Sequence, residues 1–208
     1  MTSDVDICNL ALGHLGDEAT VTSIDPAEGS IQAEHCQRYY PIARKALLEI
    51  HPWNFAKKRR ALTALDETPP ESWAYVYAYP NGCAKPLKLL STGSTDDDAG
   101  EDFVVEMLDD AQVIYTNVED AILVYTALVT DMTKYSALAI NAMARLLASY
   151  LAGPIIKGET GIKVAASHLK IYKEVDLPLA VAHDANSRKK QAGNTYQNYT
   201  PTTIAARR

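Results

Sequence analysis

The most regular pattern of apolar positions in the chain lies between residues 33 and 50. Apolar side chains recur there at alternating gaps of three and four residues, at Ala33, Cys36, Tyr40, Ala43, Leu47 and Ile50. This spacing places all of them on one face of a helix. Pro41 lies inside the pattern and removes one backbone hydrogen bond, so we expect a kink near residues 37–41. The helix is expected to begin after Ser30 and to end at His51, because Pro52 disfavours the α conformation in the residue before it.

Two aromatic rings and four cations follow this helix. Trp53 and Phe55 are separated by a single residue, which puts both rings on one face of an extended segment. Their ordinary role would be to close the base of a helical core. Residues 57–60 have the sequence Lys-Lys-Arg-Arg, and these cations are either solvated or part of a binding surface.

Three further helices are predicted by their apolar periods. The first begins at a capping box formed by Ser3 and Asp6, and Gly16 is a natural stop for it. A second begins near residue 133 and is expected to end at Gly153-Pro154. A third begins near Glu159, and Pro178 should bend or end it.

The middle of the chain has the alternating pattern of strands. Residues 73–79 alternate with period two and run into Pro-Asn-Gly, and β-rich runs follow at residues 85–90, 103–108, 112–116 and 121–129. These runs predict a meander of four to six short strands.

The patterns together predict an α+β fold. Residues 1–65 and 130–192 are expected to form a helical bundle, and residues 66–129 a small antiparallel β-region inserted into it. Residues 193–208 have no apolar period and are expected to form an extended, flexible C-terminal arm that becomes ordered on binding.

Charge is distributed unevenly along the 208 residues. The chain has a formal net charge of −6. From Asp184 onward, five basic side chains and one acidic side chain give +4, so the preceding residues carry −10. An acidic body with a basic tail is unlike a general nucleic-acid binder, which presents a basic face. We expect the tail to dock on an acidic surface.

The remaining composition argues against several classes of protein. The three cysteines are far apart, which predicts neither a disulfide framework nor a zinc site. No run of about 18 apolar residues is present, so no membrane association is expected. The first residues have no basic n-region and do not resemble a signal peptide.

Two short motifs suggest ligand sites but lack the required residues. Residues 153–160, Gly-Pro-Ile-Ile-Lys-Gly-Glu-Thr, resemble a phosphate-binding loop, yet Glu159 stands where the lysine should be and a helix precedes it. Asp96 and Asp98 suggest a calcium loop, but the glycine and glutamate that such a loop needs are absent. With no catalytic pair elsewhere, we expect no enzyme activity, no cofactor and no metal.

Tyrosine is in excess, with 12 Tyr against 2 Phe. Tyr75, Tyr77 and Tyr79 share one side of a predicted strand, and Tyr196 and Tyr199 lie in the arm. Tyrosine is enriched at interfaces because it buries a ring and still offers a hydroxyl. The three strand tyrosines are therefore either a half-exposed sheet face or a contact between subunits.

One stretch of the chain resembles a known family. A helix with Tyr40, Arg44 and Leu47 runs into Pro52, Trp53, Phe55 and Ala56, and a basic run follows. This order resembles the head-to-tail adaptors of short-tailed bacteriophages, also called tail tubular protein A. The opening helix that ends in Leu15-Gly16 and the Val-x-Ser-Ile-like loop after it are similar too.

The resemblance implies a structural virion protein. Twelve identical chains would form a ring between the portal protein and the tail nozzle protein, around a channel for DNA. The protein would lie in the neck of the virion, and in the host cytoplasm during assembly. Its core or interface anchors would be Tyr40, Arg44, Leu47, Trp53 and Phe55, ring or nozzle contacts Tyr75, Tyr77 and Tyr79, and the portal-docking arm would use Tyr196, Tyr199, Ile204, Arg207 and Arg208. The alternative is a nucleic-acid-binding module that uses Lys57–Arg60 and the basic tail, with Trp53 as a stacking ring.

Overall fold

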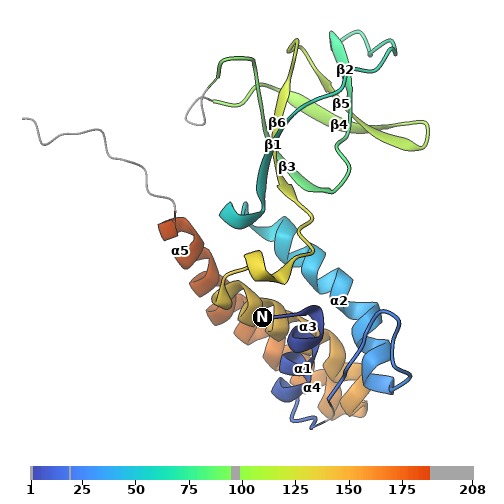
Figure 1. Ribbon diagram of the computed structural model, residues 1–208, viewed down its shortest axis with the longest axis vertical. Coiled ribbons are helices and arrows are strands. Elements are labelled where there is room, and N and C mark those ends of the chain that lie inside the picture. The colour runs from blue at the N-terminus through green and yellow to red at the C-terminus, as the bar shows by residue number, and fades with distance from the viewer. Residues whose placement is uncertain (1, 19, 95–98, 188–208) are drawn as a thin grey trace, which may run out of the picture.

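The fold is described from a computed structural model for residues 2–18, 20–94 and 99–187 (Figure 1). Helices form one part of the molecule and strands the other, which confirms the α+β class. The helices are α1 (Asp4–His14), α2 (Ile31–Ile50), α3 (Ala137–Ile156), α4 (Gly158–Ile171) and α5 (Leu177–Ser187). The strands are β1 (Lys57–Ala61), β2 (Tyr75–Ala78), β3 (Cys83–Leu90), β4 (Phe103–Leu108), β5 (Ala111–Thr116) and β6 (Ile122–Ala127).

Helix α3 is the centre of the helical part and packs against α1, α2, α4 and α5. By length and composition alone it could also cross a membrane, contrary to the sequence-based expectation that no segment could. Many of its residues are fully buried, as expected for the central helix of a bundle. Contrary to expectation, α3 does not end at Gly153-Pro154. It continues to Ile156, and the chain turns at Lys157 and Gly158, which both have positive φ angles (61° each).

The turn after α3 brings α4 back against it at close range. A Cβ atom added at Gly161 would lie 3.0 Å from the carbonyl oxygen of Ala152. A side chain here would crowd the backbone of α3, so glycine favours the close approach of the two helices. The stretch that resembles a phosphate-binding loop is thus the end of one helix and the start of the next.

The predicted starts of the first helices agree with the structure. Ser3 and Asp6 form a complete capping box, and Ser30 caps α2 by accepting a hydrogen bond from the amide of Ala33 (3.2 Å). Helix α2 continues through Pro41 and ends at His51. Residues Asn54–Ala56 form a short 3₁₀ helix (η1), so the expectation of an extended segment there is wrong.

The strands form two three-stranded antiparallel sheets, in the orders β1-β6-β3 and β2-β5-β4. Isolated bridges join the sheets at both edges, between Ala64 and Tyr77 and between Leu89 and Glu101. The strands therefore follow one another around a small closed barrel. The expected meander is wrong, because β6 pairs between β1 and β3 rather than with β5.

Strand β1 was also missed by the sequence pattern. Lys57–Ala61 was assigned to the helical part, but it pairs along its length with β6. Its side chains are mostly exposed, as is typical of an edge strand that carries charges instead of an apolar stripe.

Candidate interaction site at the joint between the helices and the barrel

The joint between the two parts of the molecule is built around Trp53. Its side chain is fully buried, and its Nε1 donates a hydrogen bond to the carbonyl oxygen of Leu47 (2.6 Å). That carbonyl lies in the last turn of α2, where helix carbonyls lack partners within the helix. The indole therefore supplies a hydrogen bond to one of the unpaired carbonyl groups at the end of α2, and its ring fills the space beneath the helix.

Rings from neighbouring segments surround the indole. His51 meets it edge-on, with ring centroids 4.8 Å apart, and Phe55 lies beside it at 5.6 Å. Phe55 in turn packs on Tyr135, at 4.5 Å between centroids, just before α3. Trp53 is a buried member of the core, and Phe55 is partly buried and packs against it.

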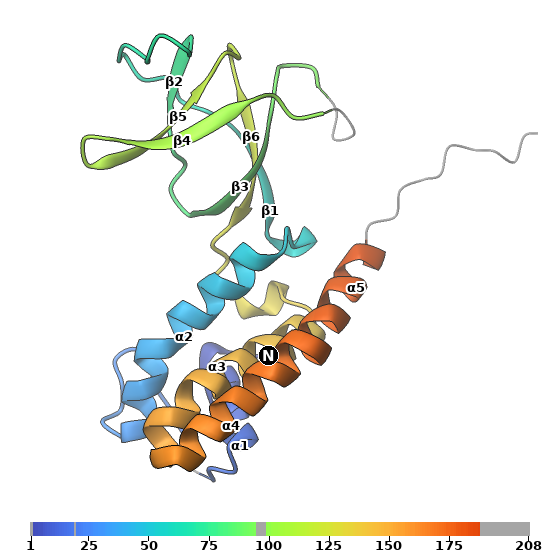
Figure 2. The same ribbon diagram turned by 180° about the vertical axis from the view of Figure 1, so that it is seen from behind.

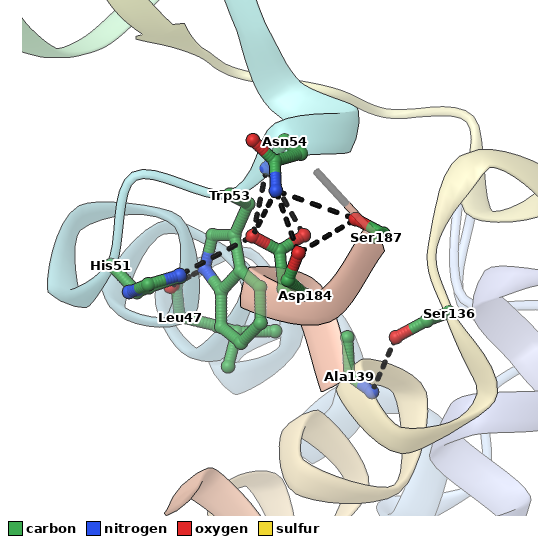
Figure 3. A network of polar contacts seen from close by, with 8 residues as sticks. All are labelled: Leu47, His51, Trp53, Asn54, Ser136, Ala139, Asp184 and Ser187. Atoms are coloured by element: carbon green, nitrogen blue, oxygen red, sulfur yellow. Dashed lines mark hydrogen bonds and ion pairs between the residues drawn. The ribbon is translucent and has the colours of Figure 1, made fainter. Parts of the chain in front are cut away.

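Asp184 on α5 is held against this joint (Figure 3). Its carboxylate accepts hydrogen bonds from the backbone amide of Asn54 (3.0 and 3.1 Å) and from the Asn54 side-chain amide (3.0 Å). The Nε2 atom of His51 lies 3.3 Å from the same carboxylate. Asn54 also donates to the backbone oxygen of Asp184 (2.7 Å), and Ser187 donates to that oxygen as well (2.6 Å).

The Asp184 side chain is only 7% exposed. A buried carboxylate is costly unless several donors surround it, and hydrogen bonds to a charged acceptor are the stronger kind. Asn54 supplies both its backbone and its side-chain donors because the 3₁₀ turn begins there. The network therefore fixes the last described turns of α5 on the segment that leads from α2 into β1.

A second contact set lies nearer the middle of α2. The hydroxyl of Tyr40 donates to Asp4 on α1 (2.9 Å), and the Arg44 guanidinium lies over the Tyr40 ring, 5.4 Å from its centroid. Arg44 also approaches Asp4 at 3.8 Å. Burial, and then the hydrogen bond to Asp4, raise the pKa of Tyr40. Tyr40, Arg44 and Leu47 thus hold α1 and the joint to α2.

A third polar set is buried between α3 and the α4–α5 run. Asp176 accepts from Arg145 (Nε, 3.1 Å) and from Asn141 (2.9 Å), and Arg145 Nη1 lies 3.2 Å from His168 Nδ1. Burial, followed by the charge of Arg145, lowers the pKa of His168 and of the adjacent His14.

Asp176 reaches Arg145 from a π-helical turn, Tyr172–Asp176 (η3), that links α4 and α5. In this turn the amide of Leu177 bonds to the carbonyl of Tyr172, five residues back. Pro178 follows and has no amide hydrogen to donate. The wider turn lets the helix run continue past the proline, where we expected a bend or an end.

The three strand tyrosines do not form one exposed face. Tyr77 is 3% exposed and donates its hydroxyl hydrogen to the carbonyl of Val118 (2.9 Å), so it belongs to the core. The rings of Tyr75 and Tyr77 stack with centroids 6.3 Å apart. Only Tyr75 and Tyr79, which are half-buried, keep a surface that another molecule could contact.

The cations at 57–60 are separated by the strand geometry. Side chains alternate across a β-strand, so Lys58 and Arg60 lie on one face and Lys57 and Arg59 on the other. The arm residues Tyr196, Tyr199, Ile204, Arg207 and Arg208, and the acidic pair Asp96 and Asp98, lie outside the described residues. Within the described ranges, no group of three His, Cys, Asp or Glu side chains could hold a metal ion.

The sequence pattern missed the polar members of the joint. Asn54 lies between Trp53 and Phe55, and Asp184 is 130 residues away in the chain. No periodicity connects such residues. The only available signal was a charged residue among the apolar positions of α5.

The chain was compared with protein-family models and with curated proteins. No family model matches it, and neither does any curated protein.

Proposed function

We propose that this chain is a structural virion protein, a head-to-tail adaptor that forms a ring between the portal and the tail nozzle of a short-tailed bacteriophage. The observation that carries the proposal is that three residues of the resemblance, Leu47, Trp53 and Phe55, meet at one joint. Leu47, Trp53 and Phe55 connect α2, the barrel and α3, and Asn54 beside them holds α5.

Such a joint suits a protein that works by shape. The helical part, the barrel and the base of the C-terminal segment are fixed relative to one another through Trp53, Asn54 and Asp184 (Figure 3). A ring subunit needs this property, because its contacts to neighbouring copies and to the proteins above and below must lie at constant angles. In this proposal the helical bundle forms the ring, the barrel is inserted into it, and the C-terminal arm docks on the portal.

The charge distribution is consistent with a channel protein. The residues before Asp184 carry a net charge of −10. An acidic channel wall would repel the DNA phosphates and would let DNA slide through without adhering. The protein would act in the virion neck after assembly in the host cytoplasm, and no catalytic residue, cofactor or metal takes part.

Native mass spectrometry of the full-length protein, with and without its cognate portal protein, tests this proposal. We expect a closed dodecameric ring on the portal. The control is Trp53→Ala, which removes the indole at the joint and should reduce ring formation.

The alternative nucleic-acid-binding function makes an opposite prediction. A protein that ignores the portal but binds an oligonucleotide with an affinity that collapses as salt rises would contradict the adaptor and favour binding through Lys57–Arg60.

A further inference from the structure

A groove with an apolar floor and an acidic rim lies on the outer face of the barrel. It has a volume of about 440 Å³ and is formed by the residues after β1 and by the β4–β5 hairpin. We call it the acidic groove; its lining residues are Leu65, Asp66, Glu67, Leu108, Asp109, Asp110, Ala111 and Val113.

The floor of the acidic groove belongs to a small apolar cluster separate from the main core. Val76, Val113 and Tyr115 are its buried members, and Leu65 and Leu108 pack on them while remaining partly exposed. This cluster uses the outward face of β5, because Ile114 between Val113 and Tyr115 points into the main core. An apolar side chain placed in the groove would extend this cluster.

The rim carries four carboxylates without partners. Within the described ranges, no hydrogen bond or ion pair reaches the side chains of Asp66, Glu67, Asp109 or Asp110. Like charges at this density repel one another, and a cationic occupant would relieve that repulsion. The groove therefore favours a segment with an apolar residue close to positive charges.

The chain itself contains a segment of this composition. Residues 188–208 include five basic side chains and no acidic one. Near their end, Ile204 is followed after two alanines by Arg207 and Arg208. The isoleucine matches the floor of the groove, and the two arginines match its rim.

The groove and the end of α5 at Ser187 lie on opposite sides of the molecule. In both views, the β4–β5 hairpin projects from one side of the barrel and α5 ends on the other side (Figures 1 and 2). The last described turn of α5 therefore lies on the side away from the groove of its own chain. A second copy placed beside the first in the same orientation would present its groove on the side where α5 of the first copy ends. The seventeen residues from 188 to 204 span at most about 55 Å when fully extended.

We propose that residues 204–208 of one copy bind in the acidic groove of the next copy. The contact is heterologous, with the tail of each subunit in the groove of its neighbour, and repeated contacts of this kind form a ring when the rotation between subunits closes. The inference rests on the proposed function, because copies must stand side by side. In this proposal the arm binds a neighbouring copy first and binds the portal protein later.

Disulfide trapping between two proteins tests the inference; each carries one introduced cysteine and keeps the buried Cys8 and Cys36. One full-length protein carries Ala111→Cys in the groove, the other carries Thr203→Cys in the tail, and both carry Cys83→Ala to remove the half-buried native thiol. Oxidation of the mixture without portal should give the heterodimer, and each protein alone should give none. The matched control is Met107→Cys, which is 60% exposed on the same hairpin but points to the opposite face of β4 and should cross-link poorly.

A charge variant supplies an independent readout. Asp109→Asn with Asp110→Asn should slow the trapping about fivefold, since each exposed ion pair contributes modestly. Asparagine also tolerates the positive φ of residue 109 (51°), so the hairpin should be retained. A control with Glu34→Gln and Glu174→Gln, which makes the same change in net charge elsewhere, should trap at the unmodified rate.

The outcomes separate this inference from the proposed function. The inference would be overturned if Met107→Cys cross-linked as fast as Ala111→Cys, or if the Asp109/Asp110 change did not slow cross-linking. It would also be overturned if cross-linking occurred only within a single chain that carries both cysteines. A portal-bound ring with no groove contact at any stage would also overturn it, and would leave the adaptor function standing. Trapped oligomers that never bind the portal would contradict the adaptor function instead.

Discussion

The contact between Asn54 and Asp184 should be a strongly coupled pair in the free energy of unfolding. Asp184→Ala removes a carboxylate that is 7% exposed. It leaves the backbone amide of Asn54 without its acceptor and removes one of the acceptors of the Asn54 side-chain amide. Each donor left without a partner costs about 1–3 kcal/mol when buried, and these are partly buried, so we expect a loss of about 3 kcal/mol. Asn54→Ala removes only the side-chain donor and should cost about 2 kcal/mol.

The double variant distinguishes a network from two independent sites. Once Asp184 is absent, the side chain of Asn54 has lost its main partner, so removing it should add little. We expect the double variant to be about 1.5 kcal/mol more stable than the sum of the single losses predicts. Urea denaturation of the four proteins measures this coupling. Amide exchange in α5 locates it, because the end of α5 should open first.

His183→Ala is the matched control. His183 lies beside Asp184 on α5, is exposed, and should change stability by less than about 0.5 kcal/mol. Losses from the two single variants that add within about 0.3 kcal/mol would refute the argument that this network fixes α5 to the joint.

Three further predictions concern single contacts. Trp53→Phe should cost about 2–3 kcal/mol in urea denaturation, because it leaves a void and frees the Leu47 carbonyl, whereas Phe55→Leu, at a half-buried ring, should cost less. Tyr77→Phe should cost about 1 kcal/mol through the lost bond to Val118, while Tyr75→Phe should be nearly neutral, and equal losses would contradict the different burial of the two residues. The lowered pKa values of His14 and His168 mean that the unfolded state binds protons more readily, so this contribution to stability is present above the ordinary value of 6.5 and is lost as the pH falls below it. Thermal unfolding between pH 7.5 and 5 should show this loss, and His168→Gln should reduce it.

The helices of the fold could be read from the sequence because their signals are local. The caps at Ser3 and Ser30 and the apolar stripe of α2 each act within one or two turns, and the structure agrees with all three. The strand runs in the middle of the chain were found for the same reason. Their pairing was not, since the position of β6 between β1 and β3 depends on contacts between segments far apart in the chain.

The segments that differ from the sequence-based expectation do so for one physical reason. In each of them, tertiary contacts outweigh the local conformational preference of the residues. Strand β1 is almost wholly charged or polar on the outside and is held by backbone pairing with β6, so it has no apolar stripe to detect. Helix α3 continues past Pro154, and the close approach at Gly161 packs α4 against its half-buried last turns. Both deviations require a partner that only the folded chain supplies.

Pro178 shows how the same effect serves the buried polar contacts. In a regular helix the proline ring would clash with the carbonyl oxygen four residues earlier. The π turn at Tyr172–Asp176 avoids this clash. The turn also places Asp176 on the side that faces Arg145 and Asn141. Replacing Pro178 with Ala would remove the reason for the wide turn. If the run then became a regular helix, every residue after it would rotate by about 100° relative to α3. Asp184 would then leave Asn54, so the ion pair between α3 and η3 and the network at the joint depend on the same irregular turn.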